Sequence, residues 1–199
     1  MRPIRLFEED KLYFITNRTI QGRLLMRPSP LLNQTIGAIL ARGLQLYSVR
    51  LYGFVFTSNH FHLILSGKPR AISRFMSHLQ SNIARQVGAM IDWRAKFWGR
   101  RYSAEPILDD DALVGRLQYI FEHGVKEGLV NTAQKWPGLT CIPELTQSKQ
   151  RDFQWFHKSR YQLAKLHRSD VKRKDFEETL PLAVHPLPHW ETLSKQEQS

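Results

Sequence analysis

The hydrophobic and polar positions of the 199-residue chain change their period several times, and each change predicts an element. Residues 11–20, KLYFITNRTI, are rich in aromatic and β-branched side chains, which favours a strand. Residues 31–44 then place apolar side chains at the spacing of one helix face. We therefore expect the fold to open with a strand followed by a helix.

The next segments predict a β-hairpin and a second helix. Residues 47–56 and 60–65 are apolar and of strand length, and the polar triplet TSN between them suits a tight turn. From about residue 71 to residue 90, apolar side chains recur at helical spacing. Residues 97–108 are expected to form a loop that leads into a short strand.

A third helix is predicted over residues 109–124. Aspartates stand at its start, where they favour a helix N-terminus, and Gly124 stands where a glycine commonly ends a helix. Its apolar side comprises Leu113, Val114, Leu117, Ile120 and Phe121. A second side comprises Ala112, Arg116, Tyr119 and His123. Tyr119 and His123 are therefore neighbours on a side that is not the main core stripe.

Interleaved strands and helices around a hairpin predict an α+β fold, with an antiparallel sheet and helices packed on one face. The pattern weakens after about residue 130. We expect residues 1–130 to form the main domain and residues 131–199 a basic, partly irregular extension, with helix near residues 151–168. Within it, residues 149–174 hold nine Lys or Arg against two Asp.

Charge and cysteine content narrow the class of protein. Lys and Arg number 29 against 18 Asp and Glu, a net charge of +11. A surplus of this size attracts polyanions, of which nucleic acid is the commonest, although a merely basic surface is the alternative. The single cysteine, Cys141, excludes an internal disulfide and a thiolate-rich metal site. Apolar runs are too short for a membrane span and no secretory signal precedes them, so we expect a cytoplasmic protein.

Two histidines stand one residue apart in the stretch TSNHFHLILSG, residues 57–67. In a strand, His60 and His62 share one face while Phe61 and its alternate neighbours share the other. Two adjacent imidazoles can hold one metal ion, but among eight histidines such a pair also arises by chance. A metal site and a solvent-facing structural pair therefore both remain open. For Tyr119, the alternative to a chemical role is an amphipathic side chain at the rim of the core.

Several segments in order carry a resemblance to a known family. GFVFTSNHFHLIL, then a helix, then FWGRRYSAEPILDDDALVGRLQYIFEHGVKEGLV and WPG, resemble the single-tyrosine HUH transposases, particularly the REP-associated tyrosine transposases. HUH denotes His-hydrophobe-His, which His60, Phe61 and His62 match. The resemblance covers roughly residues 10–140 and includes the NRT of the first strand.

The resemblance implies a ferredoxin-like domain that nicks and rejoins single-stranded DNA. It implies that His60 and His62 hold Mg²⁺ or Mn²⁺ and that Tyr119 is the nucleophile, which becomes a 5′-phosphotyrosine. The family commonly has Gln or Asn four residues after the tyrosine as a third metal ligand, and here that residue is His123. His123-Gly124 also replaces the usual Asn-Pro. Imidazole is softer than a carboxamide oxygen, which favours Mn²⁺ or Zn²⁺ over Mg²⁺.

The expected partner is single-stranded or hairpin DNA, bound by a monomer or a homodimer, with no membrane involved. Arg18, Arg100 and Arg101 are candidates for phosphate contacts, and Trp98 and Tyr102 for base stacking. FWGRRY could equally be a structural loop. Likewise, residues 149–174 are either a grip on a hairpin stem or a solvated basic tail.

Two other functions stay open at this stage. One is a DNA-hairpin-binding protein of the same fold whose altered EHG stretch no longer supports nicking. The other is a metal-dependent hydrolase that uses three histidines and an activated water. The first differs from the transposase in forming no covalent adduct, and the second in not needing Tyr119.

Overall fold

The sheet has the strand order and the connections of a ferredoxin-like fold. The computed structural model describes residues 7–9, 11–168 and 170–188. Its first six major elements are β1 (Tyr13–Arg18), α1 (Pro30–Leu46), β2 (Val49–Phe56), β3 (His60–Gly67), α2 (Pro69–Met90) and β4 (Ser103–Pro106). The strands pair in the order β2-β3-β1-β4, and every pair is antiparallel. The α+β class and the antiparallel sheet are therefore confirmed.

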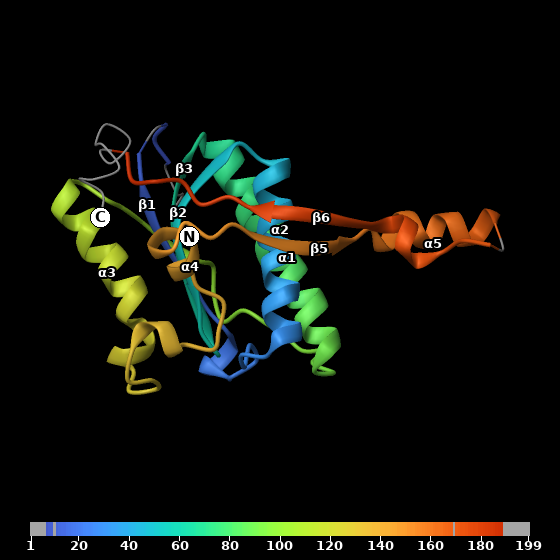
Figure 1. The fold of residues 1–199 in the computed structure, drawn as a ribbon, viewed down its shortest axis with the longest axis horizontal. Helices are drawn as coiled ribbons and strands as arrows, with labels where there is room; N and C mark the ends of the chain where they lie inside the picture. The colour runs from blue at the N-terminus through green and yellow to red at the C-terminus, as the bar shows by residue number, and fades with distance from the viewer. Residues whose placement is uncertain (1–6, 10, 169, 189–199) are drawn as a thin grey trace.

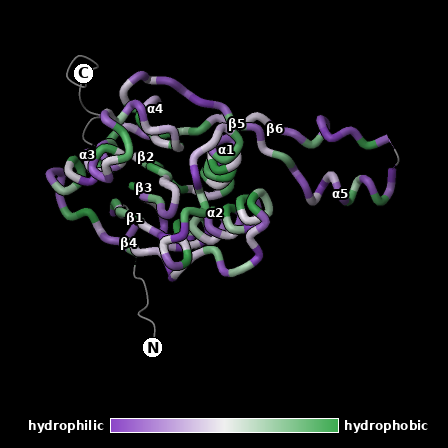
Figure 2. The backbone as a smooth tube through the Cα atoms, turned by 90° about the horizontal axis from the view of Figure 1, so that it is seen from below, coloured by the Kyte–Doolittle hydropathy of each residue, from purple (hydrophilic) through white to green (hydrophobic). Residues whose placement is uncertain are grey.

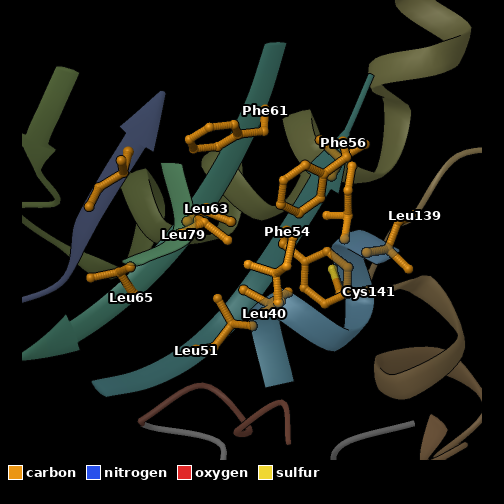
Figure 3. Close-up of a cluster of buried hydrophobic side chains, with 14 of the residues drawn as sticks. Leu40, Leu51, Phe54, Phe56, Phe61, Leu63, Leu65, Leu79, Leu139 and Cys141 are labelled. Atoms are coloured by element: carbon orange, nitrogen blue, oxygen red, sulfur yellow. The ribbon is translucent and has the colours of Figure 1, made fainter. Parts of the chain in front are cut away.

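Helices cover both faces of this sheet (Figure 1). On one face, α1 and α2 pack against β3 through alternate side chains, with Phe61, Leu63 and Leu65 in the buried cluster drawn in Figure 3. On the other face lies α3 (Asp110–Lys126), which contacts β2 and β3. The predicted packing of helices on one face of the sheet is correct for α1 and α2. The third helix forms a further layer because its own buried side chains cover the second face.

The start of α3 follows the prediction, and its end does not. Asp109 caps the helix by accepting a 2.7 Å hydrogen bond from the Ala112 backbone N–H. The helix then continues through Gly124 to Lys126, and the glycine with left-handed backbone geometry is Gly128, at φ 67°. Gly124 is instead buried against Trp136, since a Cβ there would lie 2.9 Å from the indole Cε3.

The apolar side predicted for α3 is displaced around the helix. The side chains that are buried are those of Leu113, Leu117 and Ile120, together with His123, whereas Val114 is 47% exposed. The apolar side is displaced because α3 packs on the sheet face that carries the imidazoles of His60 and His62. His123 is buried among them rather than facing solvent.

Part of the extension forms an arm. The elements of the extension are α4 (Ile142–Thr146), β5 (Arg151–Phe156), α5 (Lys158–His167) and β6 (Glu177–Leu182), with short 3₁₀ turns at Ala133–Lys135 and Arg173–Phe176. The arm consists of β5, α5 and β6, whereas α4 lies at the body of the molecule (Figure 1). β5 and β6 pair antiparallel over six residues, and α5 lies at their far end, away from the body (Figures 1 and 2). Residues 151–156 are thus a strand and not helix, since Phe153 and Trp155 alternate with the polar Asp152 and Gln154, which suits a ladder.

The base of this arm is fixed on α1. Phe153 of β5 lies so close to the helix that a Cβ at Gly37 would fall 2.1 Å from its ring. Residues 139–141 also run along the outer edge of β2, where Phe56 N–H donates to the Leu139 carbonyl at 2.8 Å. The division between residues 130 and 131 stays a prediction, and side chains from both sides of it share one core.

No helix within the described part of the chain has the length and apolar character needed to cross a membrane.

Gly37 and Gly115 make a matched test of the arm's packing. Gly37→Ala should lower the free energy of unfolding by about 1–3 kcal/mol, because the new methyl group overlaps the buried Phe153 ring. Gly115→Ala should raise it by roughly 0.5–1 kcal/mol, because Gly115 lies on an exposed helix surface with no atom within 4 Å of a new Cβ. Urea unfolding measures both values. Equal effects of the two substitutions would contradict the close packing of Phe153 on α1.

Candidate active site

Three histidines from β3 and α3 meet between the sheet and the helix. His60, His62 and His123 are all buried, with exposed fractions of 8%, 5% and 1%. Their candidate ligand nitrogens all lie within 4.8 Å of one another, and Nε2 of His60 is 2.7 Å from Nε2 of His123. The three residues to which metal binding was assigned are therefore brought together, although more than fifty residues of chain separate His62 from His123.

The turn before β3 sets the orientation of His60. The Asn59 amide Nδ2 donates to the Gly22 carbonyl at 3.0 Å, which directs Oδ1 to His60 Nδ1 at 2.5 Å. A carboxamide oxygen only accepts hydrogen bonds, so Nδ1 of His60 carries the proton. The Thr57 hydroxyl lies 2.9 Å from the same nitrogen. The lone pair of Nε2 consequently faces the other histidines, the arrangement that outer partners impose on metal-binding imidazoles.

His62 is held by β1, its neighbour in the sheet. Its Nδ1 lies 2.8 Å from the Thr16 hydroxyl, and its ring stacks on Phe14 with centroids 5.1 Å apart. Its Nε2 is buried and has no hydrogen-bond partner among the described residues, and the same is true of Nδ1 of His123. Leaving a buried polar atom unpaired costs about 1–3 kcal/mol, and a cation bound to Nε2 of His62 would remove that cost for this nitrogen. The donor set therefore fits a metal ion.

Burial keeps the three imidazoles neutral. Desolvation is the main cause that lowers the pKa of His60 to about 4 and that of His62 to about 2, with neighbouring histidines and Arg18 as further causes. The pKa of His123 is also lowered, again mainly by burial. Near pH 7 all three rings are neutral, so each has one nitrogen lone pair available to a cation.

Tyr119 lies beside this cluster in the same chain. It precedes His123 by one helical turn, and its ring centroid is 5.2 Å from that of His62 and 5.1 Å from that of His123. The ring is half-buried and also meets Phe14 edge-on at 6.1 Å. One chain therefore supplies both the three histidines and the tyrosine.

Positive charge surrounds the site. Arg18 is exposed at the end of β1 and pairs in register with His60. Arg116 of α3 places its guanidinium 4.6 Å from the centre of the Phe14 ring and 2.9 Å from Glu105. Both arginines add to the lowering of the pKa of His62, after burial and the two neighbouring histidines.

The loop over residues 97–102 lies along the end of β1. Gly99 N–H donates to the Arg18 carbonyl at 2.9 Å. The exposed Arg100 and Arg101 come directly after Gly99, so this part of the loop begins beside Arg18. Trp98 packs edge-on against Phe61 at 5.4 Å and donates its indole N–H to the Gln80 carbonyl at 2.9 Å. These contacts favour a structural role for Trp98.

Tyr102 is half-buried and packs against the core. The base-stacking roles of Trp98 and Tyr102 and the phosphate-binding roles of the arginines stay predictions.

Sequence reasoning assigned no role to several residues that support the site. Thr16 and Phe14 lie on the strand face that contacts His62. The sequence indicated only that Asn59 belongs to a turn. Alternation along residues 11–20 places Thr16 and Phe14 on one face. Which histidine they meet depends on the register of β1 against β3, which the chain pattern does not contain.

A His-x-His pair on a central strand of a ferredoxin-like sheet, with a tyrosine on the helix that covers it, is similar to the site expected from the resemblance to the HUH transposases. A family model described as "Transposase IS200 like" matches residues 26–123, a span that includes both histidines of the pair, Tyr119 and His123. This segment of the chain therefore matches the IS200-like transposase family.

Two solved structures match this chain, and the first has a similar fold. A REP-associated tyrosine transposase described as bound to a REP hairpin shares 15% identity, with a TM-score of 0.63, over 74% of this chain and 86% of its own. A putative transposase from Deinococcus radiodurans R1 shares 17% identity, with a TM-score of 0.42, over 60% of this chain and 95% of its own. Among curated proteins no sequence matches.

Removing one histidine should abolish the response to metal. Mn²⁺ or Zn²⁺ at 100 times its dissociation constant should stabilise the native protein by about 2.7 kcal/mol, and His62→Ala should remove this shift. His78 is a matched control, since it is half-buried on α2 and lies outside the cluster. Thermal unfolding with and without metal measures the effect. A full metal shift in His62→Ala would contradict the assigned ligands.

The partner of His60 should matter nearly as much as a ligand. Asn59→Ala should weaken metal binding about 10- to 100-fold, because it removes the acceptor that keeps the proton on Nδ1 of His60. Ser58→Ala changes the neighbouring turn residue, whereas Nδ1 of His60 contacts Asn59 and Thr57, and it should leave the affinity within about twofold. Isothermal titration calorimetry compares the two variants. Equal affinities would show that Asn59 does not orient the ligand.

Proposed function

We propose that this protein is a transposase that cleaves and rejoins single-stranded DNA beside a hairpin, with Tyr119 as the nucleophile. The observation that carries the proposal is the position of the Tyr119 ring, about 5 Å from two members of a buried three-histidine cluster. The match to the IS200-like family and the net charge of +11 support DNA as the substrate. A DNA substrate also supports the expected cytoplasmic location.

The reaction exchanges one phosphodiester for another. The Tyr119 hydroxyl oxygen bonds to phosphorus while the bond from phosphorus to the 3′ oxygen breaks, and the phenolic proton is passed on to leave a free 3′-OH. The product is a 5′-phosphotyrosine. Attack by another 3′-OH on this linkage restores the tyrosine and joins the strands. Rejoining needs no nucleotide triphosphate, because the covalent linkage retains the bond energy.

His60, His62 and His123 would hold a divalent cation. Such an ion, when bound, neutralises the phosphate oxygens and makes phosphorus easier to attack. With three imidazole nitrogens and no carboxamide oxygen in the protein's donor set, the site favours Mn²⁺ or Zn²⁺ over Mg²⁺. Arg18, with Arg100 and Arg101 in the adjoining loop, would contact the phosphates of the bound strand.

We infer that the enzyme acts as a monomer with its site assembled within one chain. Tyr119 already lies beside its own histidines. The outer edge of β2 is covered by the chain's own residues 139–141, and β4 at the other edge is only four residues long and ends at Pro106. Neither edge offers a long unpaired strand to a second copy.

The covalent step is tested with a labelled single-stranded hairpin oligonucleotide and Mn²⁺. Wild-type protein should form an adduct that survives denaturing electrophoresis, and Tyr119→Phe should form none, because it lacks the attacking oxygen. Tyr102→Phe is a matched control outside the cluster and should retain adduct formation. An adduct that persists in Tyr119→Phe would contradict the assigned nucleophile.

The same experiment separates the competing functions. Tight hairpin binding without an adduct in wild-type protein would favour a binding protein that has lost catalysis. Metal-dependent hydrolysis that is unaffected by Tyr119→Phe would favour a three-histidine hydrolase.

The residue at position 123 should decide the preferred metal. His123→Asn substitutes a carboxamide for the imidazole, so the rate of adduct formation with Mg²⁺ should rise relative to the rate with Mn²⁺ by about tenfold or more. The ratio of the two rates measures the change and is insensitive to a general loss of stability. An unchanged ratio would show that His123 does not contact the metal.

A further inference from the structure

We propose that the face of the molecule opposite the histidine cluster binds single-stranded DNA, in a groove between helices α1 and α2 and the arm. This inference extends the proposed function, but it requires neither Tyr119 nor a metal. The arm lies outside the part of the chain that the transposase family model matches.

The two helices on this face carry only positive charge. Over their combined lengths, α1 and α2 contain no Asp or Glu, and they contain four arginines, which are Arg42, Arg70, Arg74 and Arg85. All but Arg42 are exposed. A helical surface of this composition attracts the phosphates of a nucleic acid.

The arm closes one side of a groove over these helices. A cavity of about 550 Å³ is lined by Arg42 of α1, by Arg85 of α2, and by Trp155, Lys158 and Arg160 of the arm. Lys158 and Arg160 are exposed, and neither forms an ion pair with an acidic group among the described residues. Their charges are therefore available to a ligand.

Glu178, an acidic group that contacts two residues lining this groove, is already engaged. Glu178 of β6 lies 2.8 Å from His157 and 3.6 Å from Arg42. These contacts occupy Glu178 at the base of the arm, so most of its repulsion of a phosphate is compensated locally. Arg85 donates to the Asn82 side chain at 2.5 Å, which leaves its remaining guanidinium N–H groups for a phosphate.

Aromatic side chains inside the groove favour a single strand over a duplex. Trp155 is half-buried, with its ring 6.2 Å from that of His78 and 6.4 Å from that of His157. Single-stranded binding combines cationic grooves with aromatic platforms for unpaired bases. In a duplex the faces of the bases are stacked on one another and cannot reach such a platform.

The contact between Trp155 and His78 links the groove to a second hollow on α2. This hollow, about 400 Å³, is lined by Arg74, by Ser77 and Ser81, and by His78. Hydroxyl groups and an arginine suit the sugar-phosphate backbone. Together the two hollows form a track along the exposed side of α2 that ends at the arm.

The track lies on the other side of the sheet from Tyr119, because α3 and the pair α1 and α2 cover opposite faces (Figure 1). It therefore cannot hold the phosphate that Tyr119 would attack. We infer that it holds a stretch of strand that flanks the cleaved site and so increases the affinity for DNA with long single-stranded flanks.

The test uses the full chain, a fluorescein-labelled oligothymidylate of about 20 nucleotides, and EDTA to remove metals, with fluorescence anisotropy as the readout. The double substitution Arg85→Glu/Arg160→Glu should weaken binding at least about tenfold. It should also reduce the slope of log affinity against log salt by about 1.4, since each lost phosphate contact on a single strand contributes about 0.7.

The control makes the same change of charge elsewhere. Arg50→Glu/Lys135→Glu reverses two exposed charges that do not line the groove, and it should weaken binding less than about threefold. Trp155→Leu should weaken binding about 5- to 100-fold by removing a stacking platform. Circular dichroism checks that every variant is folded.

Three results would overturn the inference. They are equal losses in the groove and control variants, unchanged binding in both the Arg85/Arg160 and the Trp155 variants, and a duplex of the same length that binds as tightly as the single strand. The proposed cleavage by Tyr119 and the proposed binding in the groove are separated by measuring whether the groove variants form the covalent adduct on a short hairpin substrate. If wild-type protein forms no adduct but the groove variants still lose oligothymidylate binding, only the proposed cleavage fails.

Discussion

The packing of α3 across the second face of the sheet is the contact on which the site depends. It brings Nε2 of His123 to 2.7 Å from Nε2 of His60. Two glycines make this close approach feasible. A Cβ at Gly53 of β2 would lie 3.0 Å from Leu117 of the helix, and Gly124 lets Trp136 lie against the end of α3. Larger side chains at these positions would push the helix outward and carry Tyr119 and His123 away from the pair on β3.

Burying the imidazoles lowers the stability of the folded protein, and the packing of the rest of the fold compensates for this loss. Two of their nitrogens have no hydrogen-bond partner among the described residues, and neighbouring residues fix the orientation of His60 and His62. An apolar core would be more stable here without a ligand. Such a rigid and poorly satisfied donor set is typical of a site preorganised for a cation. On the opposite face, the basic helices and the arm add a surface suited to the polyanion that the reaction would use.

Strong periodicity allowed much of the fold to be predicted from the sequence. The hairpin around TSN and the helices over residues 31–44 and 71–90 depend on local patterns, and the structure has them with small changes of boundary. The predicted end of α3 was wrong, because Gly124 packs against Trp136 and does not end the helix. The prediction of helix at residues 151–156 was wrong for a similar reason, since the strand β5 depends on pairing with β6. The His60, His62 and Tyr119 assignments came from a motif, whereas Asn59 and Thr16 required the three-dimensional contacts.

The central claim is that His60, His62 and His123 hold one metal ion beside Tyr119. Anomalous diffraction from crystals of the full chain grown with Mn²⁺ tests it most directly. We expect one strong anomalous peak within about 2.0–2.3 Å of a nitrogen from each of the three histidines. An empty cluster in crystals that hold Mn²⁺ at another site, or an ion bound without His123, would contradict it.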